Sequence, residues 1–301
     1  MTQQGSMTAS EWLMLFVLSL VWGGSFLFGA VAVSELPPIT VAFVRVSGAA
    51  LMLWCLLCTL GYRVPCRFAV WQAFFIMGLL NNVVPFSLIF WAQTDISAGL
   101  ASILNATTPI FTVLVAHGLT TDERLTPARA AGVLLGFAGV VVIFGGQIGT
   151  GSGPWPLLAV LCAAVSYAVA SVFGKCFAGL GVEPIVTAAG QVTASSVLLL
   201  PVMLFLDQPW ALGMPAPAVL WSLAGLVLLS TALAYVLFFR ILATAGATNL
   251  MLVTLLIPVS AVLLGVIILS EVVSLHQIAG LLLIALGLVV TDGRIPGKVR
   301  G

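Results

Sequence analysis

Long apolar runs, separated by short polar stretches, recur along the whole chain. Each run has about 18 or more residues and few charges, enough to cross a hydrocarbon core of roughly 30 Å as a helix. The stretches between them are too short to fold alone. The pattern therefore predicts an all-α integral membrane protein with ten transmembrane helices, over residues 12–33, 38–60, 70–91, 97–118, 127–147, 155–177, 184–206, 217–240, 246–269 and 274–291.

The composition supports a membrane protein without a soluble domain. Hydrophobic residues make up 61% of the chain and charged residues 6%, whereas about 25% of a soluble domain is charged. The first apolar run is too long for a signal peptide and lacks a basic flank, so we expect it to remain as a helix. The chain's main environment is then the lipid bilayer.

The basic residues predict the orientation. With the N-terminus in the cytoplasm, the predicted outer loops carry acidic but no basic residues. Basic residues gather in loops on the cytoplasmic side, as the positive-inside rule requires, so both termini are expected in the cytoplasm. The inner residues are Arg63, Arg67, Arg124, Arg129, Lys175, Arg240, Arg294, Lys298 and Arg300. The outer acidic residues are Glu35, Asp95, Asp207 and Glu271.

The two halves of the chain repeat one another. Gly132 and Gly139 match Gly280 and Gly287 at one offset, and five helices per half is an odd number, so the second repeat is expected to be inverted. Inverted repeats are typical of secondary transporters, whose binding cavity lies at the repeat interface. The predicted parts are tail 1–11, first five-helix repeat 12–148, linker 149–154, second repeat 155–291 and tail 292–301, around a central cavity. Gly132 and Gly136 predict close helix packing, within the chain or at a dimer surface.

Three prolines within the apolar runs follow a polar residue by four positions. The pairs are Asn81 and Pro85, Asn105 and Pro109, and Thr254 and Pro258. A helical proline leaves the carbonyl four residues earlier without its N–H partner, and lipid does not satisfy such groups. One interpretation is kinked helices held by interhelical hydrogen bonds. The other is a cavity, favoured because Asn81-Asn82 fall opposite Ser230-Thr231 in the repeats, and Phe86 opposite Tyr235.

Arg45 is the one ionisable residue well inside a predicted span. A charge at that depth is a functional-site hypothesis. It can bind a substrate carboxylate, or it can lock helices together by bonding carbonyls; the sequence leaves both open. The acidic residues lie in tails, loops or span edges, which disfavours a buried proton relay and a site for cationic drugs.

Other kinds of chemistry find little support. Cys55 and Cys58 lack His or acidic partners at ligand spacing, so no metal is expected, and no ATP-binding or hydrolase motif occurs. The net charge of +1 gives no hint of a nucleic-acid partner. We therefore expect neither an enzyme nor a cofactor.

The chain resembles the EamA-type members of the drug/metabolite transporter superfamily. The residues that carry the resemblance are Val21-Trp22-Gly23-Gly24-Ser25-Phe26, the Arg45 helix, Pro109 with Asp122-Glu123, Pro258 with Glu271, and Gln277-Ile278-Ala279-Gly280. It implies ten helices in two inverted halves, a shared cavity, and an exporter in a bacterial inner membrane. Ala30 departs from the lysine that many members carry there.

These observations predict a secondary transporter that exports small neutral or zwitterionic metabolites, with amino acids favoured, by alternating access. A broad multidrug or other-metabolite exporter is the alternative, and a passive channel is the alternative from a different class. A single copy is sufficient, although a homo-oligomer is compatible. The expected substrate-binding residues are Trp22, Arg45, Asn81, Asn82, Phe86, Asn105, Tyr167, Gln191, Thr231 and Tyr235, with Pro85, Pro109 and Pro258 as hinges.

Overall fold

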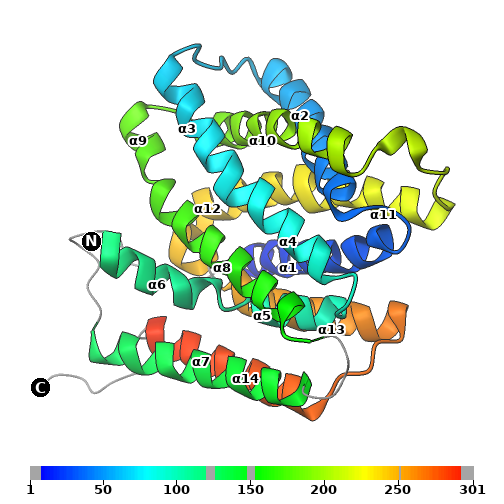
Figure 1. The fold of residues 1–301 in the computed structure, drawn as a ribbon. Coiled ribbons are helices and arrows are strands. Elements are labelled where there is room, and N and C mark those ends of the chain that lie inside the picture. The colour runs from blue at the N-terminus through cyan, green and yellow to red at the C-terminus, as the bar shows by residue number, and fades with distance from the viewer. Residues whose placement is uncertain (1–7, 120–125, 148–152, 251, 293–301) are drawn as a thin grey trace, which may run out of the picture.

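The computed structural model describes residues 8–119, 126–147, 153–250 and 252–292 (Figure 1). Within these ranges the regular elements are helices, as the apolar runs predict. The predicted tails and linker lie largely outside the described residues: residues 1–7, 148–152 and 293–301 are among those not described.

The first half of the chain contains five apolar helical segments, some of them interrupted. In chain order its elements are α1 (Ala9–Val33), α2 (Pro38–Leu60), α3 (Phe68–Gly78), the π-helix η1 (Leu79–Val83), α4 (Val84–Ala92), α5 (Ala98–Asn105), α6 (Thr108–Leu119) and α7 (Pro127–Gln147). The predicted spans of this half agree with these segments to within a few residues.

The second half follows a similar plan. Its elements are α8 (Trp155–Phe173), α9 (Cys176–Leu180), α10 (Pro184–Leu206), the short 3₁₀ helix η2 (Pro209–Ala211), α11 (Pro217–Val227), the π-helix η3 (Leu228–Leu233), α12 (Ala234–Leu250), α13 (Val253–Leu269) and α14 (Leu275–Asp292). Across the described part of the chain, eight segments are long and apolar enough to cross a membrane, and α13 and α14 are shorter apolar helices.

One predicted boundary is wrong. The sequence places a break between residues 240 and 246, but α12 continues to Leu250, and Arg240 lies inside this helix rather than at a helix end. The polar side chains there bind carbonyls of their own helix: Thr244 Oγ1 donates to the Arg240 carbonyl at 3.1 Å, and Asn249 Nδ2 donates to the Ala245 carbonyl at 2.9 Å. Polar residues in this stretch are thus compatible with helix.

Pro109 lies at a helix start and not in mid-helix as predicted. The helix breaks at residues 106–107, and Pro109 is the second residue of α6, a position that needs no N–H donor. Thr108 Oγ1 donates to the Asn105 carbonyl at 2.7 Å, which is the carbonyl that a proline at 109 leaves unpaired. Pro258, in contrast, lies inside the continuous helix α13.

Each half carries one π-helical turn at matching positions. η1 contains Asn81 and Asn82, and η3 contains Ser230 and Thr231, the two polar pairs that the repeat comparison aligns. A π-turn shifts the backbone hydrogen bond from i−4 to i−5, and such bulges are frequent at functional sites. The carbonyl that Pro85 leaves unpaired is therefore that of Leu80 and not, as expected, that of Asn81.

Helices α7 and α14 pack closely through glycines. A Cβ added at Gly139 would lie 2.7 Å from the carbonyl oxygen of Gly280, and one added at Gly287 would lie 2.6 Å from that of Gly132. Since residue numbers rise along one helix as they fall along the other, the two helices run antiparallel, side by side (Figure 1). The close packing predicted for Gly132 and Gly136 is therefore made within one chain.

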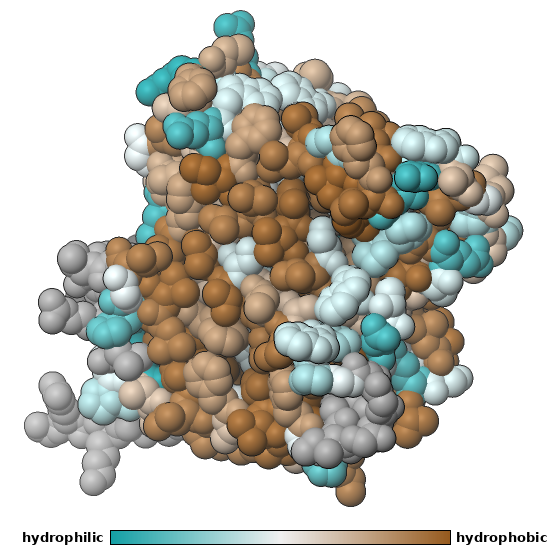
Figure 2. Space-filling model, viewed as in Figure 1, coloured by the Kyte–Doolittle hydropathy of each residue, from teal (hydrophilic) through white to brown (hydrophobic). Residues whose placement is uncertain are grey.

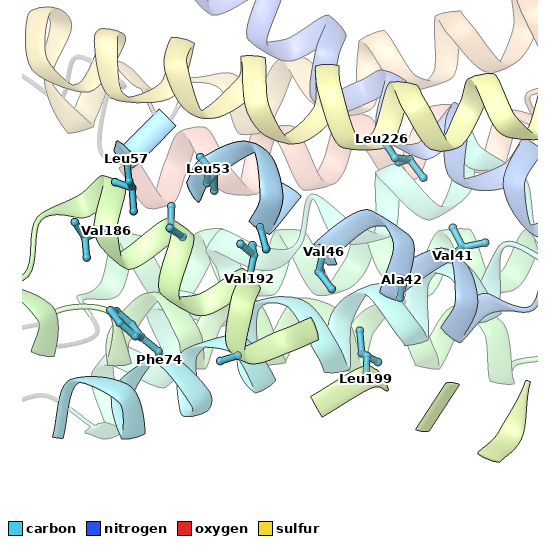
Figure 3. Packing of buried hydrophobic residues seen from close by; sticks show 14 of the residues in the cluster. Val41, Ala42, Val46, Leu53, Leu57, Phe74, Val186, Val192, Leu199 and Leu226 are labelled. Carbon is cyan, nitrogen blue, oxygen red and sulfur yellow. The ribbon is translucent and has the colours of Figure 1, made fainter. Parts of the chain in front are cut away.

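Branched aliphatic residues from both halves form the largest buried cluster. Leu53 of α2, Phe74 of α3 and Val192 of α10 belong to it, and Figure 3 shows their side chains between the helices. Trp54 Nε1 adds a hydrogen bond to Thr193 Oγ1 at 3.0 Å. The face of the molecule shown in Figure 2 is mainly apolar, with the most hydrophilic residues toward its edges, as expected for lipid contact.

Candidate functional site

A cavity of about 800 Å³ lies between the two halves. It is lined by residues from α1, α2, α3, η1, α4, α5, α6, α8, α9, α10, η3, α12 and α13. None of the described residues of α7 and α14 does. The lining is mostly apolar, with a limited number of polar groups, which is the general character of small-molecule sites.

The residues predicted to bind substrate all line this one cavity. They are Trp22, Arg45, Asn81, Asn82, Phe86, Asn105, Tyr167, Gln191, Thr231 and Tyr235. Of the predicted hinges, Pro109 and Pro258 also line it, whereas Pro85 is buried outside the lining. The structure thus brings the predicted residues together; their role in binding stays a prediction.

Arg45 carries the only fixed charge among the described lining residues. Its guanidinium carbon lies 4.0 Å from the centroid of the Phe86 ring, within the range of a cation–π contact. Its Nε atom is buried and has no hydrogen-bond partner. A buried N–H donor without an acceptor is costly. The arrangement therefore favours binding of an anionic group over the helix-locking interpretation, in which carbonyls would accept from this side chain.

Three lining residues form a chain of side-chain hydrogen bonds, here called the amide chain: Asn81, Gln191 and Tyr235. Asn81 Nδ2 donates to Gln191 Oε1 at 3.3 Å, and Gln191 Nε2 donates to the Tyr235 hydroxyl at 3.1 Å. The three residues come from η1, α10 and α12. Because Gln191 uses both ends of its amide, it fixes the orientation of its two neighbours.

Replacing Gln191 by Leu is expected to weaken transport, raising the substrate concentration at half-maximal rate by about tenfold. The reason is that Asn81 and Tyr235 lose their common partner. Thr193→Val is the matched control, because Thr193 lies on the same helix but binds Trp54 and does not line the cavity. Equal effects of the two variants on transport in proteoliposomes would contradict a role for the amide chain.

Asn82 is more buried than its neighbour Asn81 and is hydrogen-bonded to another helix. Its side chain is 2% exposed, and Nδ2 donates to Ser195 Oγ at 2.9 Å. Ser195 Oγ in turn lies 2.6 Å from the Gln191 carbonyl and 3.2 Å from the Gly78 carbonyl. The interhelical hydrogen bond expected for a packing helix is therefore present at Asn82, in addition to its place in the cavity lining.

Each π-turn is hydrogen-bonded to the first helix of the other half: η1 to α8, and η3 to α1. Ser166 Oγ of α8 donates to the Leu80 carbonyl at 2.6 Å, which satisfies the group that Pro85 leaves unpaired. Ser230 Oγ of η3 donates to the Val21 carbonyl of α1 at 3.1 Å. Ser166 directly precedes Tyr167, and Val21 directly precedes Trp22; both aromatic residues line the cavity. In each half, a π-turn is thus hydrogen-bonded to the first helix of the other half, with the π-turn as acceptor in one case and as donor in the other.

Aromatic rings supply much of the apolar wall. The Trp22 and Phe238 ring centroids are 5.9 Å apart, and those of Phe86 and Phe90 are 6.2 Å apart. Trp91 is 44% exposed and does not line the cavity, so its position fits an interfacial aromatic residue better than a pocket residue.

The structure adds polar lining residues that the sequence interpretation omitted. Gln93 and Ser102 lie in the cavity wall. Gln93 Nε2 donates to the Phe26 carbonyl at 2.8 Å, and Ser102 Oγ donates to the Gly99 carbonyl at 2.7 Å. Gln93 lies at the end of an apolar run, where a polar residue usually marks only the membrane boundary. No proline or repeat partner distinguished either residue.

The comparisons with known proteins agree with this architecture. The model of the EamA-like transporter family matches residues 10–145 and again 154–291. The chain belongs to the EamA-like transporter family and is an integral membrane protein of the transporter class, with two family repeats.

Related proteins resemble it over most of their length. An uncharacterized transporter, YoaV, from Bacillus subtilis (strain 168) is 26% identical over 90% of this chain and 92% of its own. The uncharacterized inner membrane transporter YedA from Escherichia coli (strain K12) is 28% identical over 83% and 80%. Protein PecM from Dickeya dadantii (strain 3937) is 26% identical over 92% and 90%. A crystal structure 23% identical in sequence has the same fold, with a TM-score of 0.66 over 95% of this chain and 98% of its own.

Proposed function

We propose that this chain is a secondary transporter that exports small neutral or zwitterionic metabolites, with amino acids as the favoured class, by alternating access. The observation that carries the proposal is Arg45 at the wall of a cavity of about 800 Å³, with a buried Nε atom that has no hydrogen-bond partner. A substrate carboxylate would supply its missing partner through charge-assisted hydrogen bonds.

The rest of the lining fits a substrate with a polar end and an apolar body. Asn81, Asn105 and Thr231 offer amide and hydroxyl groups, while Trp22 and Phe86 offer ring surfaces. Phosphorylated substrates would need more cations than Arg45, and cationic drugs would need a carboxylate. A broad multidrug exporter draws support from the cavity volume, which lies in the range of drug-sized sites, roughly 300–1,000 Å³.

The proposed topology is ten transmembrane helices in two inverted repeats around the cavity, in a bacterial inner membrane with both termini cytoplasmic. The antiparallel packing of α7 against α14 through repeat-equivalent glycines supports the inversion. The inner-membrane location draws support from the name of the Escherichia coli relative, and the orientation from the distribution of basic residues. α13 and α14 would be the shortest spans.

Counterflow in proteoliposomes tests this proposal. We expect saturable uptake of labelled aromatic or aliphatic amino acids, accelerated when the unlabelled amino acid is trapped inside, because a carrier must return its site across the membrane. Uptake without saturation or acceleration would favour a passive channel. No uptake of any amino acid, in vesicles whose protein is demonstrably folded, would contradict the amino-acid class and favour the multidrug or other-metabolite alternative.

A further inference from the structure

Three acidic side chains at one end of the molecule each bind backbone N–H groups of the other repeat. Glu271, after α13, accepts from the Ala98 and Gly99 amides of α5 at 2.6 and 3.0 Å. Asp207, after α10, accepts from the Thr40 amide and hydroxyl in the first turn of α2, each at 2.7 Å. Glu35, after α1, accepts from the Ala216 amide at the start of α11 at 2.7 Å.

Each contact places a negative charge on the unpaired N–H groups at the N-terminus of a helix. Such groups have no partner within their own helix, and the helix dipole favours an anion there. Hydrogen bonds of this charge-assisted kind are stronger than neutral ones. Glu35, Asp207 and Glu271, here called the carboxylate latch, therefore connect the two repeats by contacts that depend on ionised side chains.

The Glu271 carboxylate packs closely against two glycines, Gly99 and Gly265. A Cβ added at Gly265 would collide with the Glu271 carboxylate, and one added at Gly99 would lie 3.1 Å from its Oε2 atom. Ser270 adopts a left-handed conformation, with φ of 55°, which turns the chain at the end of α13. Two glycines and a turn thus direct this carboxylate onto α5.

The latch lies at the end of the molecule away from the α8–α10 connection, and the cavity lining reaches that connection. The lining includes Gly174, Phe177, Val182 and Pro184, around the α8–α10 connection, on the side predicted to be cytoplasmic. The connections that carry the latch are residues 34–37, 93–97, 207–216 and 270–274. Of these described residues, only Gln93 lines the cavity. In Figure 1 these connections lie toward the right of the molecule, opposite α9.

We propose that the carboxylate latch closes the outer end of the cavity in this conformation, and that each transport cycle must release it for the cavity to open outward. This inference rests on the proposed alternating access. Releasing the latch separates α5 from the end of α13 and α2 from the end of α10, each pair drawn from different repeats. Neutralising a latch carboxylate should therefore shift the population toward the outward-open state.

Labelling of a cysteine in the cavity tests the latch. Ser102→Cys, one turn beyond Gly99, is introduced into a version of the chain whose five native cysteines are replaced by alanine. A membrane-impermeant thiol reagent is then applied outside intact cells. We expect Glu271→Gln to accelerate labelling by about fivefold or more, because small changes in free energy shift such populations by factors of this size. Gly265→Ala, which keeps the charge but displaces the carboxylate, should act in the same direction.

Glu183→Gln is the matched control. Glu183 is exposed and occupies the N-cap position of α10, but its side chain makes no capping hydrogen bond. It should leave labelling unchanged. Hydrogen exchange of the native chain provides a second readout: Glu271→Gln should accelerate exchange at Ala98 and Gly99, where the carboxylate binds. A triple variant, Glu35→Gln with Asp207→Asn and Glu271→Gln, removes all three latch charges. Unchanged labelling in Glu271→Gln, Gly265→Ala and the triple variant would overturn the proposal, as would acceleration only for reagent applied from the cytoplasmic side.

Failure of this proposal is distinguishable from failure of the proposed substrate class. The labelling rates require no substrate, so a latch effect without amino-acid counterflow would support the gate and contradict only the amino-acid class. Amino-acid counterflow together with labelling rates that the latch variants leave unchanged would support the amino-acid class and contradict the gate.

Discussion

Arg45→Ala is expected to reduce amino-acid counterflow by about 10- to 100-fold, the effect of losing one charge-assisted contact. The guanidinium rests on the Phe86 ring and has an unpaired Nε atom, so its removal leaves no buried group without a partner. The folded fraction should therefore stay near that of the wild type. Counterflow and thermal unfolding of the same preparation measure both quantities.

Two further variants sharpen this prediction. Arg240→Ala removes an exposed arginine from α12 outside the cavity and should leave counterflow unchanged. Arg45→Lys retains a charge but loses the planar fork that matches a carboxylate, so intermediate activity is expected. A folded Arg45→Ala protein with full activity would contradict substrate binding, and loss of folded protein would instead support helix locking.

Gly139→Leu is expected to destabilise the protein by overpacking α7 against α14. The site is buried, and even a Cβ there would lie 2.7 Å from the Gly280 carbonyl and 2.9 Å from Ile284 Cγ1. Inserting methylenes into a packed interface costs typically about 1–3 kcal/mol. Since each kcal/mol lowers the unfolding midpoint of a larger domain by about 2–4 °C, a drop of about 2–12 °C is expected.

Gly145→Leu provides the control on the same helix, because a Cβ at Gly145 meets no atom within 4 Å. It should unfold within a few degrees of the wild type when both are heated in detergent and followed by tryptophan fluorescence. If the two variants lost equal stability, helix propensity rather than the α7–α14 contact would explain the effect.

Much of the architecture is predictable because the bilayer imposes simple rules. A span must be apolar and long enough to cross the bilayer, so the apolar runs alone locate most helices to within a few residues. The candidate residues are predictable for a related reason: Arg45, Asn81 and Gln191 are costly in lipid, so they turn toward a protein interior. The repeat then pairs Phe86 with Tyr235 before any coordinates are known.

The missed features depend on geometry that apolar patterns do not encode. A π-turn differs from an α-turn by one residue in its hydrogen bond, and hydropathy does not register that shift around Asn81. At the break before Pro109, the Thr108 hydroxyl binds the Asn105 carbonyl, and within α12 the side chains of Thr244 and Asn249 bind carbonyls of their own helix. Hydropathy records none of these contacts. The latch was equally hidden, because Glu271 and Ala98 are distant in sequence and only the fold brings them together.

The separation of α7 and α14 from the cavity has a practical consequence. Neither helix contributes a described residue to the lining, and the two hold each other through glycines instead. We expect this pair to stay still while the cavity walls move. Spin labels or fluorophores attached to its lipid-facing side, at Leu134 or Leu282, both well exposed, would then serve as fixed markers against which the motion of α5 and α11 can be measured.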